Sequence, residues 1–253
     1  MHKIRKFFLA TISLLLWIYF VVSSVILTPI ALLIWLLTVL FDKNLRILHL
    51  FSCFWGAQYI WVVPYWSLKI YDRKKYDRHN HYIMVSNHQS FADIVVIYSL
   101  FRHFRWTSKV ENFRIPFVGW VLALNRSIRI YRGANDAYIR LKEQAADALR
   151  KGNSVMMFPE GTRSKDGKMG KFKDGAFHLA HETHTDILPM LIEGTFGVVQ
   201  RKGWILTGSE KMILKVLDPV AYKDFCNLSV HATSDMIRER IEKELINIRS
   251  NYR

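Results

Sequence analysis

The stretch HYIMVSNHQSFADIVVIYSLF, residues 81–101, decides the fold class because a strand pattern and a helix pattern meet in it. Its first part, His81–Ser86, is a short apolar run typical of a buried strand. Its last part, Phe91–Phe101, is predicted to be a helix, and a polar loop joins the two. The stretch therefore predicts a strand–loop–helix unit of the kind that α/β domains repeat.

Outward from this unit, the chain repeats the alternation of short strands and helices after a charged cluster at Asp72–Arg78. Pro189 is expected to break the register of its strand, and Ser234 is expected to cap the last helix. We expect an α/β fold with a mainly parallel central sheet flanked by helices. Further strands are predicted at Phe104–Lys109, Ser127–Tyr131, Ser154–Phe158 and Asp186–Ile192, and further helices at Ala134–Arg150 and Ser234–Ile248.

The N-terminal part differs in kind, since no charged side chain occurs between Phe7 and Phe41. A straight helix over this run would be about 50 Å long, against about 30 Å for the hydrocarbon core of a bilayer. Pro29 lies inside the run and removes a backbone donor, so we predict a kink or break there. Basic residues flank both ends, and positive charge tends to stay cytoplasmic. These features favour a re-entrant or interfacial helical hairpin over a single tilted span.

Composition points to an anionic partner. The formal net charge is +15, which suits lipid head groups, nucleic acid or an acidic protein. The aromatic-rich stretch Ile47–Ile70 suits either the lipid–water interface or packing between the soluble core and the membrane segment. Cys53 and Cys226 form no disulfide framework and no metal-ligand spacing, so a reducing, cytosol-facing environment is expected.

Two polar clusters directly follow apolar strands, where ligands collect in α/β folds. The first, Asn87–Asp93, holds His88 and Asp93. A hydroxyl nucleophile needs a general base at neutral pH, and a carboxylate on the other ring nitrogen makes histidine a better one. The alternative is a helix N-cap by Ser90 or Asp93 with a satisfied histidine beside it.

The second cluster, Phe158–Ser164, carries a different chemistry. Arg163 offers a planar fork of donors suited to phosphate, and Gly161 allows the backbone to approach a ligand closely. Glu160 either orients a substrate hydroxyl or holds Arg163. The alternative is a polar turn closed by an ion pair between Glu160 and Arg163.

Together, Asn-His-x4-Asp at residue 87 and Phe-Pro-Glu-Gly-Thr-Arg-Ser at residue 158 resemble the glycerolipid acyltransferases, in particular the 1-acyl-glycerol-3-phosphate acyltransferases. The segment Lys109–Gly119 is similar to the family's Lys-x-Glu-Leu…Pro-x-x-Gly block, with Asn112 where leucine is usual. Leu188-Pro189 resembles its fourth block. The resemblance covers about residues 70–200. One departure concerns the acceptor: Arg126–Arg132 stands where the family often has Gly-x-x-Phe-Ile-Asp-Arg.

The resemblance implies an acyltransferase catalytic domain over residues 71–253, behind an N-terminal membrane-binding helical segment over residues 1–70. It implies that His88, oriented by Asp93, removes the proton from a lysophospholipid hydroxyl, which attacks an acyl thioester directly. The acyl donor would be acyl-coenzyme A or an acyl carrier protein, and no cofactor, metal ion or nucleic acid is expected. The implied residues for holding and shaping the acceptor site are Lys109, Arg132, Glu160, Gly161, Thr162 and Arg163.

The expected product is phosphatidic acid, made at a membrane by a catalytic domain that faces the cytoplasm. Because of the altered block at Arg126–Arg132, an acyltransferase acting on another lysophospholipid or a lyso-aminolipid remains an alternative. A more distant alternative is a non-catalytic basic protein of the membrane surface.

Overall fold

The computed structural model describes residues 2–63, 65–131, 133, 136–198, 205–206 and 210–251. Within these residues the strands form a seven-stranded sheet in the order β1-β7-β6-β2-β5-β3-β4. Every neighbouring pair is parallel except β6 and β7, so the prediction of a mainly parallel sheet is confirmed. The strands are β1 (Trp66–Tyr71), β2 (Ile83–Ser86), β3 (Phe104–Lys109), β4 (Ile128–Ile130), β5 (Ser154–Met157), β6 (Ile187–Glu193) and β7 (Glu210–Val216).

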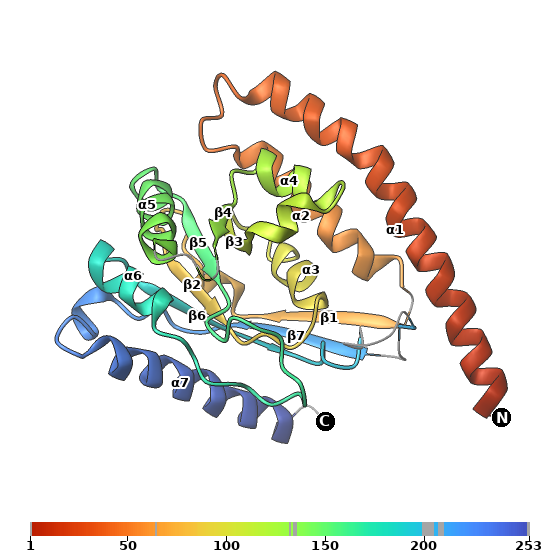
Figure 1. The fold of residues 1–253 in the computed structure, drawn as a ribbon. Helices are drawn as coiled ribbons and strands as arrows, with labels where there is room; N and C mark the ends of the chain where they lie inside the picture. The colour runs from red at the N-terminus through yellow and green to blue at the C-terminus, as the bar shows by residue number, and fades with distance from the viewer. Residues whose placement is uncertain are drawn as a thin grey trace.

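Helices cover both faces of this sheet (Figure 1). On one face lie α5, α6 and α7, and on the other α2 and α3. The α-helices are α1 (His2–Thr38), α2 (Arg46–Trp61), α3 (Ala92–Tyr98), α4 (Val118–Leu124), α5 (Ala137–Arg150), α6 (Gly175–Thr183) and α7 (Val230–Asn251), with 3-10 turns at Arg73–Lys75, Val110–Arg114 and Tyr222–Asp224.

The alternation of side chains along the central strands creates a separate core on each face of the sheet. In β2, Ile83 and Val85 join the core that α5, α6 and α7 complete. Met84, between them, joins the core beneath α2 and α3. Because both faces of the strand are buried, its sequence reads as continuously apolar rather than alternating.

The N-terminal helix α1 is continuous through Pro29, so the break predicted there and the hairpin within residues 7–41 are wrong. The chain instead reverses after Thr38, and α2 runs back along α1 (Figure 1). The two helices pack through a cluster that contains Ala31, Leu48 and Trp55. This packing continues on either side of the proline, which offsets the local loss of one backbone hydrogen bond.

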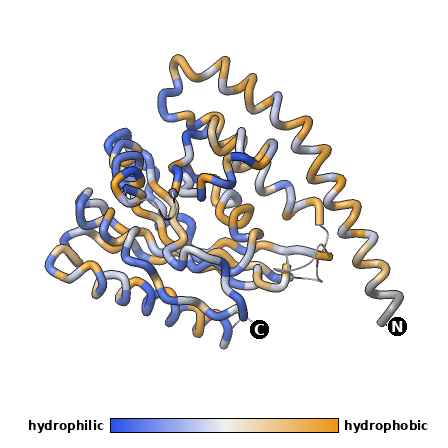
Figure 2. The backbone as a smooth tube through the Cα atoms, viewed as in Figure 1, coloured by the Kyte–Doolittle hydropathy of each residue, from blue (hydrophilic) through white to orange (hydrophobic). Residues whose placement is uncertain are grey.

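Most of α1 has the character of a membrane helix. Phe7–Thr38 is, among the described residues, the one helix long and apolar enough to cross a bilayer, with a mean hydropathy of 2.5 over its most apolar window. Only 22% of that window is buried against the rest of the chain. Figure 2 shows this apolar character along the helix. Its length and composition are those of a helix that can cross a membrane.

Three features of the fold bear on predictions made from sequence. Helix α7 begins at Val230, where Ser229 Oγ accepts a hydrogen bond from Ala232 N (3.1 Å), so Ser234 lies inside the helix and is not its cap. Pro189 does not interrupt β6, because it stays in register with Val85. Strand β1 pairs with β7 from Trp66 onward, so the sheet begins before residue 71, where the domain boundary was predicted.

Candidate active site

The candidate site lies at the edge of the sheet where β2, β3, β5 and β6 end. These four strands run parallel to one another, so their carboxyl ends meet along one edge. The loop Asn87–Phe91 leaves β2, and the loop that starts at Phe158 leaves β5. Lys109 ends β3, and Gly194 and Thr195 follow β6. The fold therefore brings together segments that are far apart in the sequence.

His88 and Asp93 form a hydrogen-bonded pair in this edge. The distance from His88 Nδ1 to Asp93 Oδ2 is 2.7 Å. Asp93 is fully buried in the first turn of α3, and the same oxygen accepts the backbone N–H of Gln89 (2.6 Å) and Ser90 (2.9 Å). Asp93 thus binds both the histidine and the backbone of the loop that precedes α3. With Nδ1 donating to a carboxylate, Nε2 carries the free lone pair of a general base.

The second cluster, Phe158–Ser164, contacts and supports the loop that carries His88. The ring of Phe158 stacks on the His88 ring, with centroids 4.0 Å apart and planes 9° apart. Glu160 Oε1 accepts the backbone N–H of His88 (2.8 Å), and Oε2 accepts that of Gly170 (2.9 Å). Burial raises the pKa of the Glu160 carboxyl, against the opposing effect of these two donors. Both oxygens of Glu160 therefore hold backbone, and its function here is to fix the His88 loop.

The predicted cations Arg163 and Lys109 lie on the loop after β5 and at the end of β3. The guanidinium carbon of Arg163 is 3.8 Å from the centre of the Phe91 ring, a cation–π contact beside the His88 loop. Lys109 is half-buried at the end of β3, and Thr162 is exposed. Gly161 has a φ of +67°, which favours glycine. The predicted contribution of Arg132 lies outside the described residues.

A further cation, Lys173, lies over this turn. Its backbone N–H donates to Pro159 O (2.9 Å), and a Cβ at Gly161 would lie 3.3 Å from Lys173 Nζ. The absence of a side chain at residue 161 thus leaves room for the Lys173 amine. Lys173 was not among the residues predicted from sequence, because the return of the chain to Pro159 is a tertiary contact.

Four polar residues of the edge were not assigned a function from sequence: Asn87, Gln89, Glu193 and Thr195. Asn87 Nδ2 donates to Ile192 O (2.8 Å), and Asn87 Oδ1 accepts from Ile192 N (2.9 Å). Gln89 Nε2 donates to Glu193 Oε2 (2.9 Å), and the Thr195 hydroxyl contacts Asp93 Oδ1. Glu193 ends β6 and Thr195 follows it, so a search at the end of that strand would have found both.

Comparison with known proteins identifies the family. A family model described as Acyltransferase matches residues 67–193. The chain belongs to the acyltransferase family. A 1-acyl-sn-glycerol-3-phosphate acyltransferase of Chlamydomonas reinhardtii is 33% identical over 195 residues, 76% of this chain and 56% of that protein. A chloroplastic enzyme of the same name from Arabidopsis thaliana is 34% identical over 176 residues, 69% of this chain and 47% of that protein.

The acyltransferase chain therefore spans about half the length of these curated relatives. Its fold matches a solved structure over the full length of both chains, with a TM-score of 0.83 and 25% identity. That structure is of a 1-acyl-sn-glycerophosphate acyltransferase from Thermotoga maritima. The family resemblance inferred from the motifs at His88 and Glu160 is thus confirmed.

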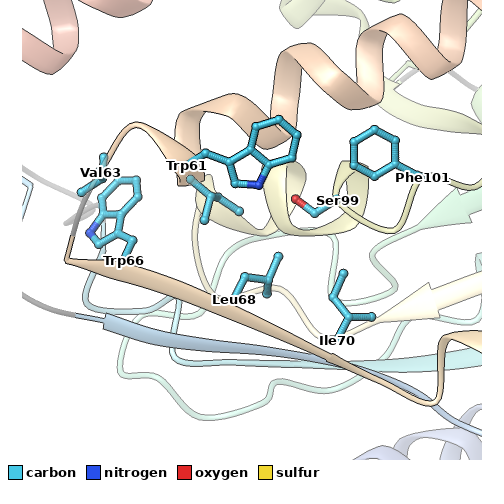
Figure 3. Close-up of a pocket in the computed structure, with 8 residues that line it drawn as sticks. Trp61, Val63, Trp66, Leu68, Ile70, Ser99 and Phe101 are labelled. Carbon is cyan, nitrogen blue, oxygen red and sulfur yellow. The ribbon is translucent and has the colours of Figure 1, made fainter.

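An apolar pocket of about 290 Å³ lies at the far end of α3 from Asp93 in the acyltransferase. Figure 3 shows Leu68 and Ile70 pointing from β1 toward Ser99 and Phe101, with Trp61 of α2 above them. The Trp61 and Phe101 rings are parallel, with centroids 6.3 Å apart. The pocket is lined by Ile60, Trp61, Val63, Trp66, Leu68, Ile70, Ser99 and Phe101. Since α3 has seven residues, about 10 Å of helix separates this pocket from the histidine pair.

Proposed function

We propose that this acyltransferase moves a fatty acyl group from an acyl thioester to the free hydroxyl of 1-acyl-sn-glycerol-3-phosphate, giving phosphatidic acid. The observation that carries the proposal is the 2.7 Å contact between His88 Nδ1 and the buried Asp93 carboxylate. The names of the Chlamydomonas, Arabidopsis and Thermotoga relatives support the choice of acceptor.

In this mechanism His88 Nε2 removes the proton of the acceptor hydroxyl as its oxygen attacks the thioester carbonyl. Asp93 stabilises the imidazolium that forms. The tetrahedral intermediate then collapses, the carbon–sulfur bond breaks, and the leaving thiolate takes the proton from His88. The reaction needs no acyl-enzyme intermediate, because the hydroxyl attacks the donor directly.

The acceptor phosphate would be held by the cations at the same edge of the sheet. Arg163 supplies a fork of donors that matches phosphate geometry. Lys109 and Lys173 add positive charge from the neighbouring loops. Arg132, predicted for the same role, remains part of the proposal.

The acyl donor is proposed to be acyl-coenzyme A or an acyl carrier protein, with its chain in the apolar pocket of Figure 3. The pocket is lined in part by Trp61 of α2, whose side chain is exposed, and α2 packs along α1 (Figure 1). Replacing Leu68 with Trp should shorten the preferred acyl chain, measured with donors of graded length. An unchanged preference would place the chain elsewhere.

Helix α1 is proposed to hold the enzyme at the membrane, with the catalytic domain on the cytoplasmic side. The low burial and high hydropathy of Phe7–Thr38 support the membrane contact. The two free cysteines, Cys53 and Cys226, are consistent with a reducing compartment. Protease accessibility of α7 in sealed vesicles would test the orientation.

The decisive experiment offers the purified protein a panel of lysolipids with both classes of donor and measures acylated product. Turnover of lysophosphatidic acid above the other acceptors is expected. Preference for another lysophospholipid would support the second acceptor that the altered block at Arg126–Arg132 suggests. Absence of acyl transfer with every pair would leave the non-catalytic membrane-surface protein as the better account.

A further inference from the structure

The Asp93 carboxylate has four partners, and they divide unevenly between its two oxygens. Asp93 Oδ2 receives His88 Nδ1 and two backbone N–H groups, and all three hold only that oxygen. The remaining oxygen, Oδ1, receives the hydroxyl of Thr195. Because Asp93 is fully buried, no water replaces a missing donor at low cost.

Thr195 reaches this oxygen because the chain turns sharply after β6. Gly194 has a φ of +85°, and a Cβ there would lie 2.2 Å from Lys211 O, so no larger residue fits the turn. The turn delivers Thr195 to a fully buried place beside α3. Its hydroxyl also lies 3.2 Å from Gln89 Oε1. A hydroxyl has one proton, and the charged carboxylate is the stronger acceptor of the two.

Gln89 connects the His88 loop to the C-terminal helix α7 through Glu193. Its Nε2 donates to Glu193 Oε2 (2.9 Å). Arg249 of α7 binds both oxygens of Glu193, with Nε at 2.9 Å from Oε1 and an amino nitrogen at 3.0 Å from Oε2. Gln89, the residue next to His88, is therefore held by Glu193 of β6. Glu193 is in turn fixed by its bidentate ion pair with Arg249.

We propose that Thr195 is a positioning residue for the His88–Asp93 pair, a role that rests on the proposed function. Its hydroxyl fixes the rotation of the Asp93 carboxylate, so that Oδ2 faces the Nδ1 proton of His88. Without it, Oδ1 is a buried charged acceptor with no donor from β6, and the carboxylate can turn away from the ring. His88 then loses the fixed tautomer that leaves Nε2 available to the acceptor hydroxyl.

The test replaces the hydroxyl with a methyl group of nearly the same size in Thr195→Val. We expect kcat to fall by about 10- to 100-fold, the effect of losing one hydrogen bond to a charged group, with KM for both substrates within about twofold. Thr195→Ser keeps the hydroxyl and should retain kcat within about threefold. The control is Thr233→Val, which removes a hydroxyl from an equally buried threonine of α7 and should leave kcat unchanged.

Two kinetic outcomes would overturn the proposal. One is wild-type kcat in Thr195→Val; the other is a loss in Thr195→Ser as large as in the valine variant. If Thr195→Val does not fold, Thr195→Ala is measured against the same criteria. Kinetics are measured with whichever lysolipid the wild type acylates, so a wrong choice of acceptor does not affect the comparison.

A readout without turnover separates this inference from the proposed function. Nitrogen NMR of labelled histidine, with His88→Asn to assign the signal, reports which ring nitrogen carries the proton. The wild type and Thr195→Ser should show a single tautomer protonated on Nδ1, and Thr195→Val a mixture. An unchanged tautomer in Thr195→Val contradicts the positioning role, whatever substrate the enzyme uses.

Discussion

Two regions of the chain differ in how their side chains are satisfied. One is the edge of the sheet around His88, and the other is helix α1. At the edge, buried polar groups are joined to one another: Asp93, Glu160 and Asn87 each bind two or more partners. Along α1, apolar side chains are left exposed and few groups tie the helix to the rest of the chain. The first arrangement fixes atoms to a fraction of an ångström. The second leaves most of the helix surface uncovered by the rest of the chain, and a bilayer can cover it.

The largest effect is expected from replacing His88, the proposed general base. His88→Ala should reduce kcat by about 1,000-fold or more, because a positioned general base contributes about 100- to 10,000-fold, while the melting temperature stays close to that of the wild type. The control is His178→Ala on the exposed side of α6. Steady-state kinetics and thermal unfolding measure both. Retained turnover would show that the edge is not the reaction site.

The next effect concerns the apolar surface of α1. The double substitution Leu15→Asp and Val22→Asp places two charges on exposed positions of the helix, each costing about 2.5–3.5 kcal/mol in a membrane. Binding to phospholipid vesicles should weaken by at least about 100-fold, measured by co-sedimentation. Ile246→Asp, on an equally exposed position of α7, is the control and should bind as the wild type does. Equal loss in both proteins would mean that α1 is not the membrane contact.

A smaller effect is expected from replacing Arg163, a cation proposed to bind the acceptor phosphate. Arg163→Ala should raise KM for the lysolipid by about 10- to 30-fold, since one charge-assisted contact to phosphate is lost. The KM for the acyl donor should change little. Arg150→Ala removes an exposed arginine from α5 and should leave both constants unchanged. A rise in donor KM alone would place Arg163 in the donor site.

The smallest effect is a pH dependence of stability. Burial raises the pKa of Glu160 in the folded protein, so the folded chain binds this proton more tightly than the unfolded chain. Rising pH therefore lowers the free energy of unfolding from the ordinary glutamate pKa up to the raised one, and the contribution is constant above it. The melting temperature of the wild type relative to Glu160→Gln should fall across that window. If the melting temperature of the wild type instead rose relative to that of Glu160→Gln with increasing pH, the raised pKa of Glu160 would be contradicted.

The sequence predicted the elements whose limits depend on local pattern. Strand β3 has the bounds predicted for it, Phe104–Lys109, and α5 ends at Arg150 as expected. Elements that depend on partners were missed. Strand β7 reads as a weak run in isolation, and it becomes a strand because β1 and β6 pair with its two edges. Pro29 looked like a break because its lost donor is visible in the sequence, whereas the packing of α1 on α2 is not.

The candidate site divides in the same way. His88, Asp93, Glu160 and Arg163 were predicted because they belong to two compact motifs, each of which follows a strand. Thr195 was not found, because its partner Asp93 lies 102 residues away in the sequence. Glu160 was assigned to substrate, whereas both of its oxygens hold backbone groups. Motifs indicate which residues gather at the edge, and only the tertiary contacts show which partner each of them binds.

The paired hydrogen bonds of Asn87 have a consequence for the chemical ageing of the enzyme. Asparagine deamidates when the backbone nitrogen of the next residue attacks the side-chain amide, and the product is a carboxylate or an isomerised backbone. Here that nitrogen belongs to His88 and is held by Glu160, while the amide is held on both sides by Ile192. The contacts that shape the site also keep the two reacting groups apart. Loosening Glu160 should therefore shorten the shelf life of the enzyme through damage one residue from its base.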